Sequence, residues 1–243
     1  IATGGTVSVN KIGTINFNRS GVQTFTKSGG TITATAGTSY RRISFVVLNG
    51  STLDMGTNVL DCATGNNVDF TVNAGGTVRL GAPGGIVAQG TSATTGNIQT
   101  SSTSIRSFST TGNYEYTGTA AQVTGDGLPS SLNNFTINNS NGVTLTNPLT
   151  VNGSLAFTAG RLEGTLTKSI TSGTTGIVNL MSADNYINIQ SSPTPTITSV
   201  TIKSYPGVTP PNPHSLYDAT LGVSRYYEIT SVAVTGYVNP KFD

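Results

Sequence analysis

The sequence predicts an all-β chain: a parallel β-solenoid (β-helix) followed by a short antiparallel, β-sandwich-like segment. Three observations lead to this prediction. In Gly112–Gly164, apolar residues recur as short alternating groups, such as Phe135 with Ile137. Each group is closed by Asn, Gly, Ser or Pro, which are turn residues. Strands this short cannot each bury a face alone, so neighbouring strands must stack their inward residues into one column.

The first 86 residues show the same alternation. Residues 1–40 carry pairs such as Val7 with Val9, separated by glycine-containing turns, and are predicted to form the first coils or a set of capping strands. A cap is expected because an open solenoid end exposes unpaired N–H and C=O groups. The segment Ile43–Ile86 is predicted to hold about two coils, at about 20–25 residues per coil. Its inward candidates are Ile43, Phe45, Val47, Leu53, Met55, Val59, Val68, Phe70, Val72, Val78 and Leu80.

Val87–Gly112 is rich in Ser, Thr, Gln and Asn, with few apolar anchors. We expect a looser coil or a surface loop here. The functional alternative is a protruding binding loop, because long loops often carry specificity.

The composition shifts at residues 191–195, SSPTP, where proline cannot donate to a strand ladder. We therefore predict a solenoid with N-terminal capping strands over residues 1–190 and an antiparallel β segment over 191–243. The latter looks too short for a complete sandwich. Either the chain is a fragment of a longer one, or a neighbouring subunit completes the sheet.

Composition restricts the function. Only 9% of residues are charged, against about 25% in ordinary domains, so solubility must depend on hydroxyl and amide groups. A net charge of +2 is too small to argue for a nucleic-acid partner or an anionic membrane. The single cysteine, Cys62, excludes an intramolecular disulfide and a cysteine-cluster metal site. The longest apolar run, Phe45–Leu48, is far shorter than the ~20 residues of a membrane span.

Three carboxylates are candidates for a catalytic or metal site. Asp54, Asp61 and Asp69 fall in neighbouring coils, with Arg79 near in sequence. Their spacing does not fix them on one face, so solvated corner residues are the default expectation. Gly125–Gly127 holds one aspartate, which cannot supply the 6–8 oxygen ligands of Ca²⁺, and we predict a tight turn. His214 has no nucleophile motif around it. We therefore predict no catalytic residue, no metal site and no cofactor.

Candidate ligand contacts come from aromatic and basic residues. Tyr114 and Tyr116 alternate and so share one face of a strand, where they would stack on sugar rings. The competing interpretation is packing against the next coil. Arg41 and Arg42 form the only adjacent basic pair, interpreted either as a ligand contact or as a solvated strand edge.

Asparagines gather near the expected corners of the central coils. They lie at positions 133, 134, 138, 139 and 141. We predict that their side chains hydrogen-bond from coil to coil and that they tolerate left-handed turn conformations. Their contribution would be to stability.

Two stretches resemble a known family. YEYTGTAAQVTGDGLP at Tyr114–Pro129, with the residues that follow it, and the segment Ile43–Ile86 resemble the repeated module of large secreted, adhesin-like proteins of Bacteroidota and related bacteria. Together the stretches cover roughly the middle half of the chain. The resemblance implies an exported, extracellular or cell-surface β-solenoid, commonly one segment of a longer polypeptide. It implies no catalytic residues.

The predicted function is an extracellular structural and adhesive segment of a bacterial cell-surface protein, without catalysis. The expected partners are other copies of the chain, flanking domains of the same long chain and surface glycans, without nucleic acid or membrane insertion. One alternative is a self-assembling filament subunit that exchanges strands through Ile1–Val9 or Tyr237–Asp243. Another is a polysaccharide-binding β-helix.

Overall fold

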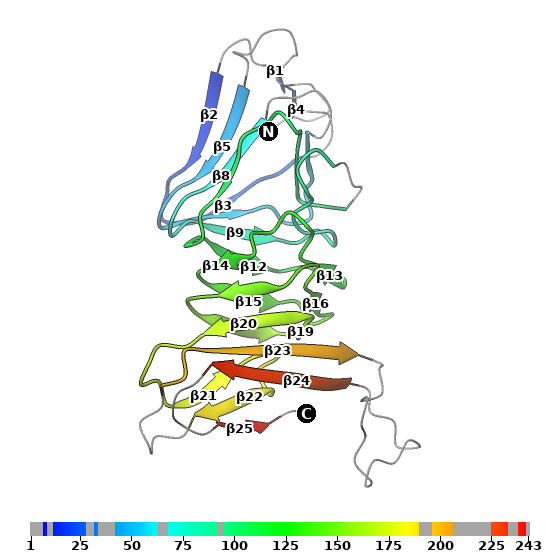
Figure 1. Ribbon diagram of the computed structural model, residues 1–243. Coiled ribbons are helices and arrows are strands. Elements are labelled where there is room, and N and C mark those ends of the chain that lie inside the picture. Colours follow the sequence, from blue (N-terminus) through cyan, green and yellow to red (C-terminus); the bar gives the residue numbers. More distant parts are fainter. Residues whose placement is uncertain are drawn as a thin grey trace.

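The computed structural model describes residues 7–8, 12–27, 32–33, 42–62, 68–91, 95–189, 196–206, 225–232 and 238–241. Within these ranges the chain is all-β and contains no helix, so the predicted fold class is confirmed at this level. In Figure 1 the strands of the middle and lower parts lie across the long axis of the molecule, one above another, whereas two blue strands near the top run steeply along it.

Most strands pair in parallel with the strand three positions later in the chain. One sheet has the order β2 (Ile12–Phe17), β5 (Arg42–Val47), β8 (Val68–Val72), β11 (Arg106–Phe108). A second has the order β3 (Gly21–Thr24), β6 (Ser51–Asp54), β9 (Thr77–Leu80), β12 (Asn113–Tyr116), β15 (Phe135–Asn138), β18 (Leu155–Ala159). A third begins with β14 (Ser131–Leu132), β17 (Leu149–Val151) and β20 (Thr165–Ser169).

The remaining parallel strands are short and follow the same rule. They are β1 (Val7–Ser8) with β4 (Ile32–Thr33), β7 (Leu60–Cys62) with β10 (Ile98–Thr100), and β13 (Gln122–Val123) with β16 (Val143–Thr144) and β19 (Leu162–Glu163). Three successive strands therefore form one repeat unit.

The length of the repeat unit differs along the chain. Tyr114 lies opposite Phe135, and Phe135 lies opposite Leu155. The spacings between these partners agree with the predicted length of one coil. Val78, however, lies opposite Tyr114, so the unit that joins these two residues is much longer than its neighbours. The extra length comes from the segment between β9 and β10, which adds turns to the chain.

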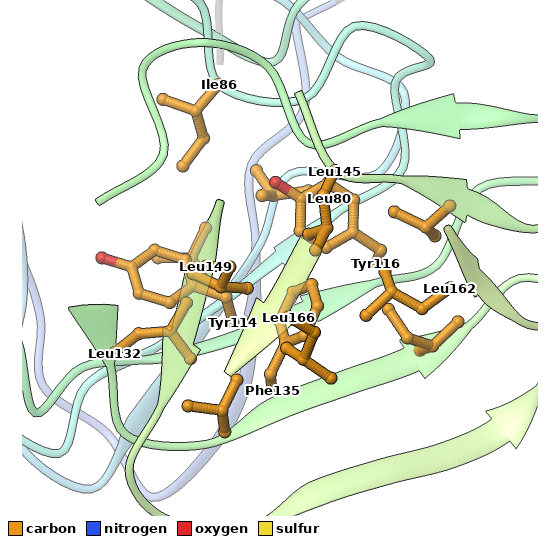
Figure 2. Close-up of a cluster of buried hydrophobic side chains, with 14 of the residues drawn as sticks. Leu80, Ile86, Tyr114, Tyr116, Leu132, Phe135, Leu145, Leu149, Leu162 and Leu166 are labelled. Carbon is orange, nitrogen blue, oxygen red and sulfur yellow. The ribbon is translucent and has the colours of Figure 1, made fainter. Parts of the chain in front are cut away.

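Inward side chains form continuous rows across the strands. One row contains Leu53, Val78, Tyr114 and Phe135, which are all at most 1% exposed. Figure 2 shows the part of this core in which Tyr114, Tyr116 and Phe135 lie among buried leucines. Rings also stack between units, with 6.3 Å between the centroids of Phe45 and Phe70. Of the inward candidates in Ile43–Ile86, all are buried except Val59, which is half-buried.

The strands after β20 pair antiparallel. In the third sheet β20 pairs with β23 (Ser199–Pro206), and β23 pairs with β24 (Arg225–Val232). A separate sheet contains β21 (Gly176–Asn179), β22 (Tyr186–Ile189) and β25 (Val238–Lys241). β20 pairs in parallel with β17 and antiparallel with β23, and β21, which begins at Gly176, is the first described strand that pairs only antiparallel. Both strands precede residue 190, where the predicted solenoid ends.

Left-handed turns are made by glycine. Gly142 and Gly160 have φ angles of +85° and +80°. No residue other than glycine has positive φ in the described ranges. None of the asparagines at positions 133, 134, 138, 139 and 141 adopts this conformation, contrary to the expectation. After Asn141, Gly142 makes the left-handed turn at lower steric cost.

Candidate functional site

The two candidate sugar-stacking tyrosines lie inside the molecule. Tyr114 and Tyr116 on β12 are 1% and 0% exposed. The ring of Tyr116 meets that of Phe135 edge-on, with 5.6 Å between centroids, and Tyr114 meets Phe108 in the same way at 6.4 Å. Because neither ring reaches the surface, the ligand-contact interpretation is corrected here, and the competing one, packing between repeat units, describes both residues.

The hydroxyl groups of these tyrosines have different surroundings. Tyr116 donates a hydrogen bond of 2.7 Å to the carbonyl of Thr124. The Tyr114 hydroxyl is buried and has no hydrogen-bond partner among the residues that the structure describes. Burial raises the pKa of Tyr114, and it raises the pKa of Tyr116 well above its ordinary value of 10.0. Both phenols therefore stay neutral in the folded chain over the physiological range.

Arg42 on β5 forms an ion pair within the sheet. Its Nη1 atom lies 2.7 Å from Oδ1 of Asp69 on β8. The same carboxylate accepts hydrogen bonds from Ser44 Oγ and from the backbone N–H of Ile105. These contacts join β5, β8 and the start of β11, so Arg42 has a positioning role in this arrangement. Arg41 lies outside the described residues.

The structure does not bring the candidate carboxylates together. Asp54, Asp61 and Asp69 lie on β6, β7 and β8, which belong to three different sheets. Asp126 accepts a hydrogen bond from the backbone N–H of Ala88 and lies in the predicted turn. No group of three His, Cys, Asp or Glu residues suited to a metal ion occurs within the described ranges. His214 lies outside them.

The polar stretch Val87–Gly112 forms part of the strand stacks. It contains β10 and β11, which pair with β7 and β8. Asn97 is fully buried, and its amide donates to the carbonyls of Gly56 and Asn58 and accepts from the N–H of Ala82. One side chain therefore joins three separate chain segments. The described part of this stretch is therefore joined to its neighbours through strand pairing and through Asn97.

Amide side chains link the central units as predicted. Asn139 donates to Oε1 of Gln122 at 2.8 Å, and Gln122 donates to the carbonyls of Leu80 and Ala82. Asn133 donates to Oδ1 of Asn113 in the preceding unit. Each amide satisfies buried or half-buried polar groups between units, so the asparagines contribute to stability.

The outward face carries ladders that sequence reasoning missed. Arg79 Nε lies 2.7 Å from Glu115 Oε2 on the next strand, and Asn138 donates to the other oxygen of Glu115. A second ladder crosses the third sheet and contains Ser131, Thr150, Thr167, Thr201 and Thr230 in register. The hydroxyls of Thr167 and Thr201 lie 2.8 Å apart. Only the pairing register brings these residues together, because their spacing in the sequence is irregular.

Arg106 on β11 is a cation on an inward row, opposite Phe70. Its Nε donates to Thr100 Oγ1, its Nη1 donates to the carbonyl of Val87, and its guanidinium lies 5.6 Å from the ring centroid of Phe108. Burial lowers the pKa of Arg106 to about 10, and Asp126 opposes this shift. Arg106 is therefore still charged at neutral pH and is held by its neighbours.

Comparisons of the chain with protein-family models, with curated proteins and with solved structures gave no match. The part of the chain that the structure describes contains no helix with the length and hydropathy needed to cross a membrane.

Proposed function

We propose that this chain is an extracellular structural and adhesive segment of a bacterial cell-surface protein, built as a parallel β-solenoid and without a catalytic step. The observation that carries the proposal is the pairing of each strand with the third strand after it, with inward rows that continue from unit to unit. Backbone hydrogen bonds between stacked strands, at a spacing of about 4.8 Å, resist bending of such a column.

The polar outer ladders supply the adhesive surface in this proposal. The row from Ser131 to Thr230 places five hydroxyl-bearing side chains on one sheet face. Hydroxyl and amide groups can hydrogen-bond to surface glycans or to another chain without a strong charge requirement. The scattered placement of Asp54, Asp61 and Asp69 favours a role without catalysis.

Limited proteolysis combined with negative-stain electron microscopy tests this proposal. We expect straight, isolated rods in which residues 112–170 resist cleavage. Leu149→Ala, which removes an inward side chain that is 3% exposed, should make the region cleavable. Thr150→Ala, on the outward side of the same strand, is the matched control and should keep the resistance. Bent or globular particles, or rapid cleavage within 112–170 of the unmodified chain, would contradict the proposal.

A second candidate is a self-assembling filament subunit. β2 and β24 are end strands of their sheets, and Ile15 and Val232 on them are 45% and 63% exposed. Unpaired strand edges with exposed apolar residues can add a strand from another chain. Fibres that form as concentration rises, and that are lost in Ile15→Lys with Val232→Lys, would favour this candidate. Ile105→Lys, which changes an exposed residue outside the strands, is the control.

A further inference from the structure

A second cation, Lys168 on β20, lies on an inward row. Its register partners are Val151 on β17 and Val200 on β23, both at most 1% exposed, and Leu132 continues the row. Alternation along β20 places Leu166 on the same face. The pattern of this row therefore predicts an apolar residue at position 168, but the chain has a lysine at this position. Departures from the local pattern concentrate at functional or strained positions.

Lys168 differs from Arg106, the other inward cation. Arg106 donates from Nε and Nη1 to Thr100 and Val87 and contacts the ring of Phe108, while its Nη2 atom is buried without a partner among the described residues. The Lys168 ammonium has three N–H donors, and within the described residues its one hydrogen bond goes to the carbonyl of Ser169. No carboxylate of the described residues lies within ion-pair distance of it. A half-buried charge without a counter-ion is costly, and burial accordingly lowers the pKa of Lys168.

A pocket of about 250 Å³ adjoins Lys168, where the chain leaves β20 toward β21. The lining residues are Asn152, Gly153, Lys168, Ser169, Ile170, Thr171, Thr174 and Val178. The Asn152 amide donates to Ser131 and accepts from Ser169. The polar groups left for a ligand are the Lys168 ammonium, the second N–H of the Asn152 amide and the hydroxyls of Thr171 and Thr174. Ile170 and Val178 supply apolar contact surface.

We propose that this pocket binds a small carboxylate ligand that also carries hydroxyl groups, such as an acidic sugar unit, with Lys168 as the counter-ion. One ammonium balances one negative charge, whereas a phosphate dianion would leave excess charge in a partly dry site. The two threonines suit ligand hydroxyls. The pocket is smaller than the usual site for a drug-sized ligand, so its volume suits one small unit. The proposal is independent of the structural role proposed above.

Lys168 also has a purely structural interpretation. Its aliphatic stem would cover the apolar row while its ammonium reaches the strand carbonyl of Ser169. The structural interpretation predicts that an added carboxylate does not bind the Lys168 ammonium, whereas the ligand-binding proposal predicts that it does.

The test is isothermal titration calorimetry of the full chain with glucuronate, with glucose as the neutral analogue and with inorganic phosphate. We expect glucuronate to bind at millimolar concentration, and the other two to bind roughly tenfold or more weakly, because a hydrogen bond to a charged group is lost or mismatched. Lys168→Met should weaken glucuronate binding to the same degree. Lys203→Met removes an exposed lysine from the neighbouring strand and should leave binding unchanged.

Titration with an oligosaccharide that ends in glucuronate shows whether the ligand is the end of a polymer or a free acid. Tighter binding than that of the free acid would support the proposal and assign a polymer end as the ligand, and equal binding would support the free acid. Absence of glucuronate binding, equal binding of glucose, or undiminished binding by Lys168→Met would overturn the proposal.

If Lys168→Met fails to fold, chemical labelling of the unmodified chain tests the same proposal. In the unmodified chain, glucuronate should protect Lys168 from an amine-reactive ester, as measured by peptide mass spectrometry. Lys203 serves as the internal control and should be labelled equally with and without the acid. Equal labelling of Lys168 under both conditions would also overturn the proposal.

Discussion

The parallel part of the molecule and the antiparallel hairpin β23–β24 differ in strand length. The parallel strands that precede β21 are two to six residues long, and side-chain amides such as Asn139 and Gln122 link the central units. The antiparallel strands β23 and β24 have eight residues each. Val232 at the end of β24 is 63% exposed.

One inward row nevertheless crosses from one part into the other. Leu149 and Leu166 are parallel partners, and Leu166 then faces Ile202 across an antiparallel pair. Leu166 and Ile202 are fully buried. Side chains alternate between faces in either strand direction, so register alone decides whether a row continues. The comparison shows that the hairpin β23–β24 extends the core of the stack. In the lower part of Figure 1 both strands of the hairpin lie below β20.

The largest expected effect is a difference in the free energy of unfolding between two variants, one in the core of the parallel part and one in the outer strand of the antiparallel part. Phe135→Ala removes a fully buried ring and should destabilise the chain by about 3–5 kcal/mol. Ile229→Ala on β24 removes a half-buried side chain and should cost about 1–2 kcal/mol, because less apolar surface returns to water. Urea unfolding followed by circular dichroism measures both values. Equal losses would show that the edge strand is as tightly packed as the core.

Two glycines with nearly equal φ angles test how tightly the chain is packed at two turns of the molecule. Gly160 and Gly173 have φ angles of +80° and +85°. A Cβ atom at Gly160 would collide with the Asn139 backbone, whereas one at Gly173 would meet no atom within 4 Å. Alanine should cost about 1–2 kcal/mol at both for the backbone conformation, and about 1–3 kcal/mol more at Gly160 for the collision. Equal unfolding free energies of the two variants would contradict the tight stacking at Gly160.

Alkaline pH should weaken the parallel part through its buried tyrosines. The folded-state pKa values of Tyr114 and Tyr116 are raised, so the unfolded chain loses these protons first. Stability from this source is complete below about pH 10 and falls above it, by up to about 1.4 kcal/mol per pH unit for each tyrosine. Absorbance at 295 nm, recorded with circular dichroism, should show these phenolates only as the chain unfolds. Their ionisation before unfolding would be inconsistent with the burial of β12.

The smallest effect contrasts two neighbouring hydroxyls. Tyr116→Phe removes the hydrogen bond to Thr124 and should cost about 1 kcal/mol. Tyr114→Phe removes a buried hydroxyl without a partner and should be neutral or stabilising. Thermal unfolding of both variants under one buffer condition gives the difference. A larger loss for Tyr114→Phe would mean that its hydroxyl has a partner in solution.

The sequence predicted the local alternation and the mostly parallel pairing, but it did not predict the register. Alternation identified inward residues such as Phe45 and Leu80, because period 2 follows directly from strand geometry. The row of hydroxyls from Ser131 to Thr230 escaped prediction, because register depends on turn lengths that vary from unit to unit. The antiparallel pairing of the strand that begins at Gly176 was not predicted for a similar reason, because side chains alternate in the same way in parallel and antiparallel strands. Lys168 was overlooked because only the register places it among valines.

Native-state hydrogen exchange tests the central claim, that the stack and the hairpin form one column. We predict that the slowest backbone amides of β17, β20 and β23 converge on one opening free energy as denaturant rises, because the row Leu149–Leu166–Ile202 couples them. If β23 instead opens at a clearly lower free energy while β17 and β20 stay protected, the hairpin is a separate unit. That result would contradict a single column and, with it, the structural role proposed for the whole chain.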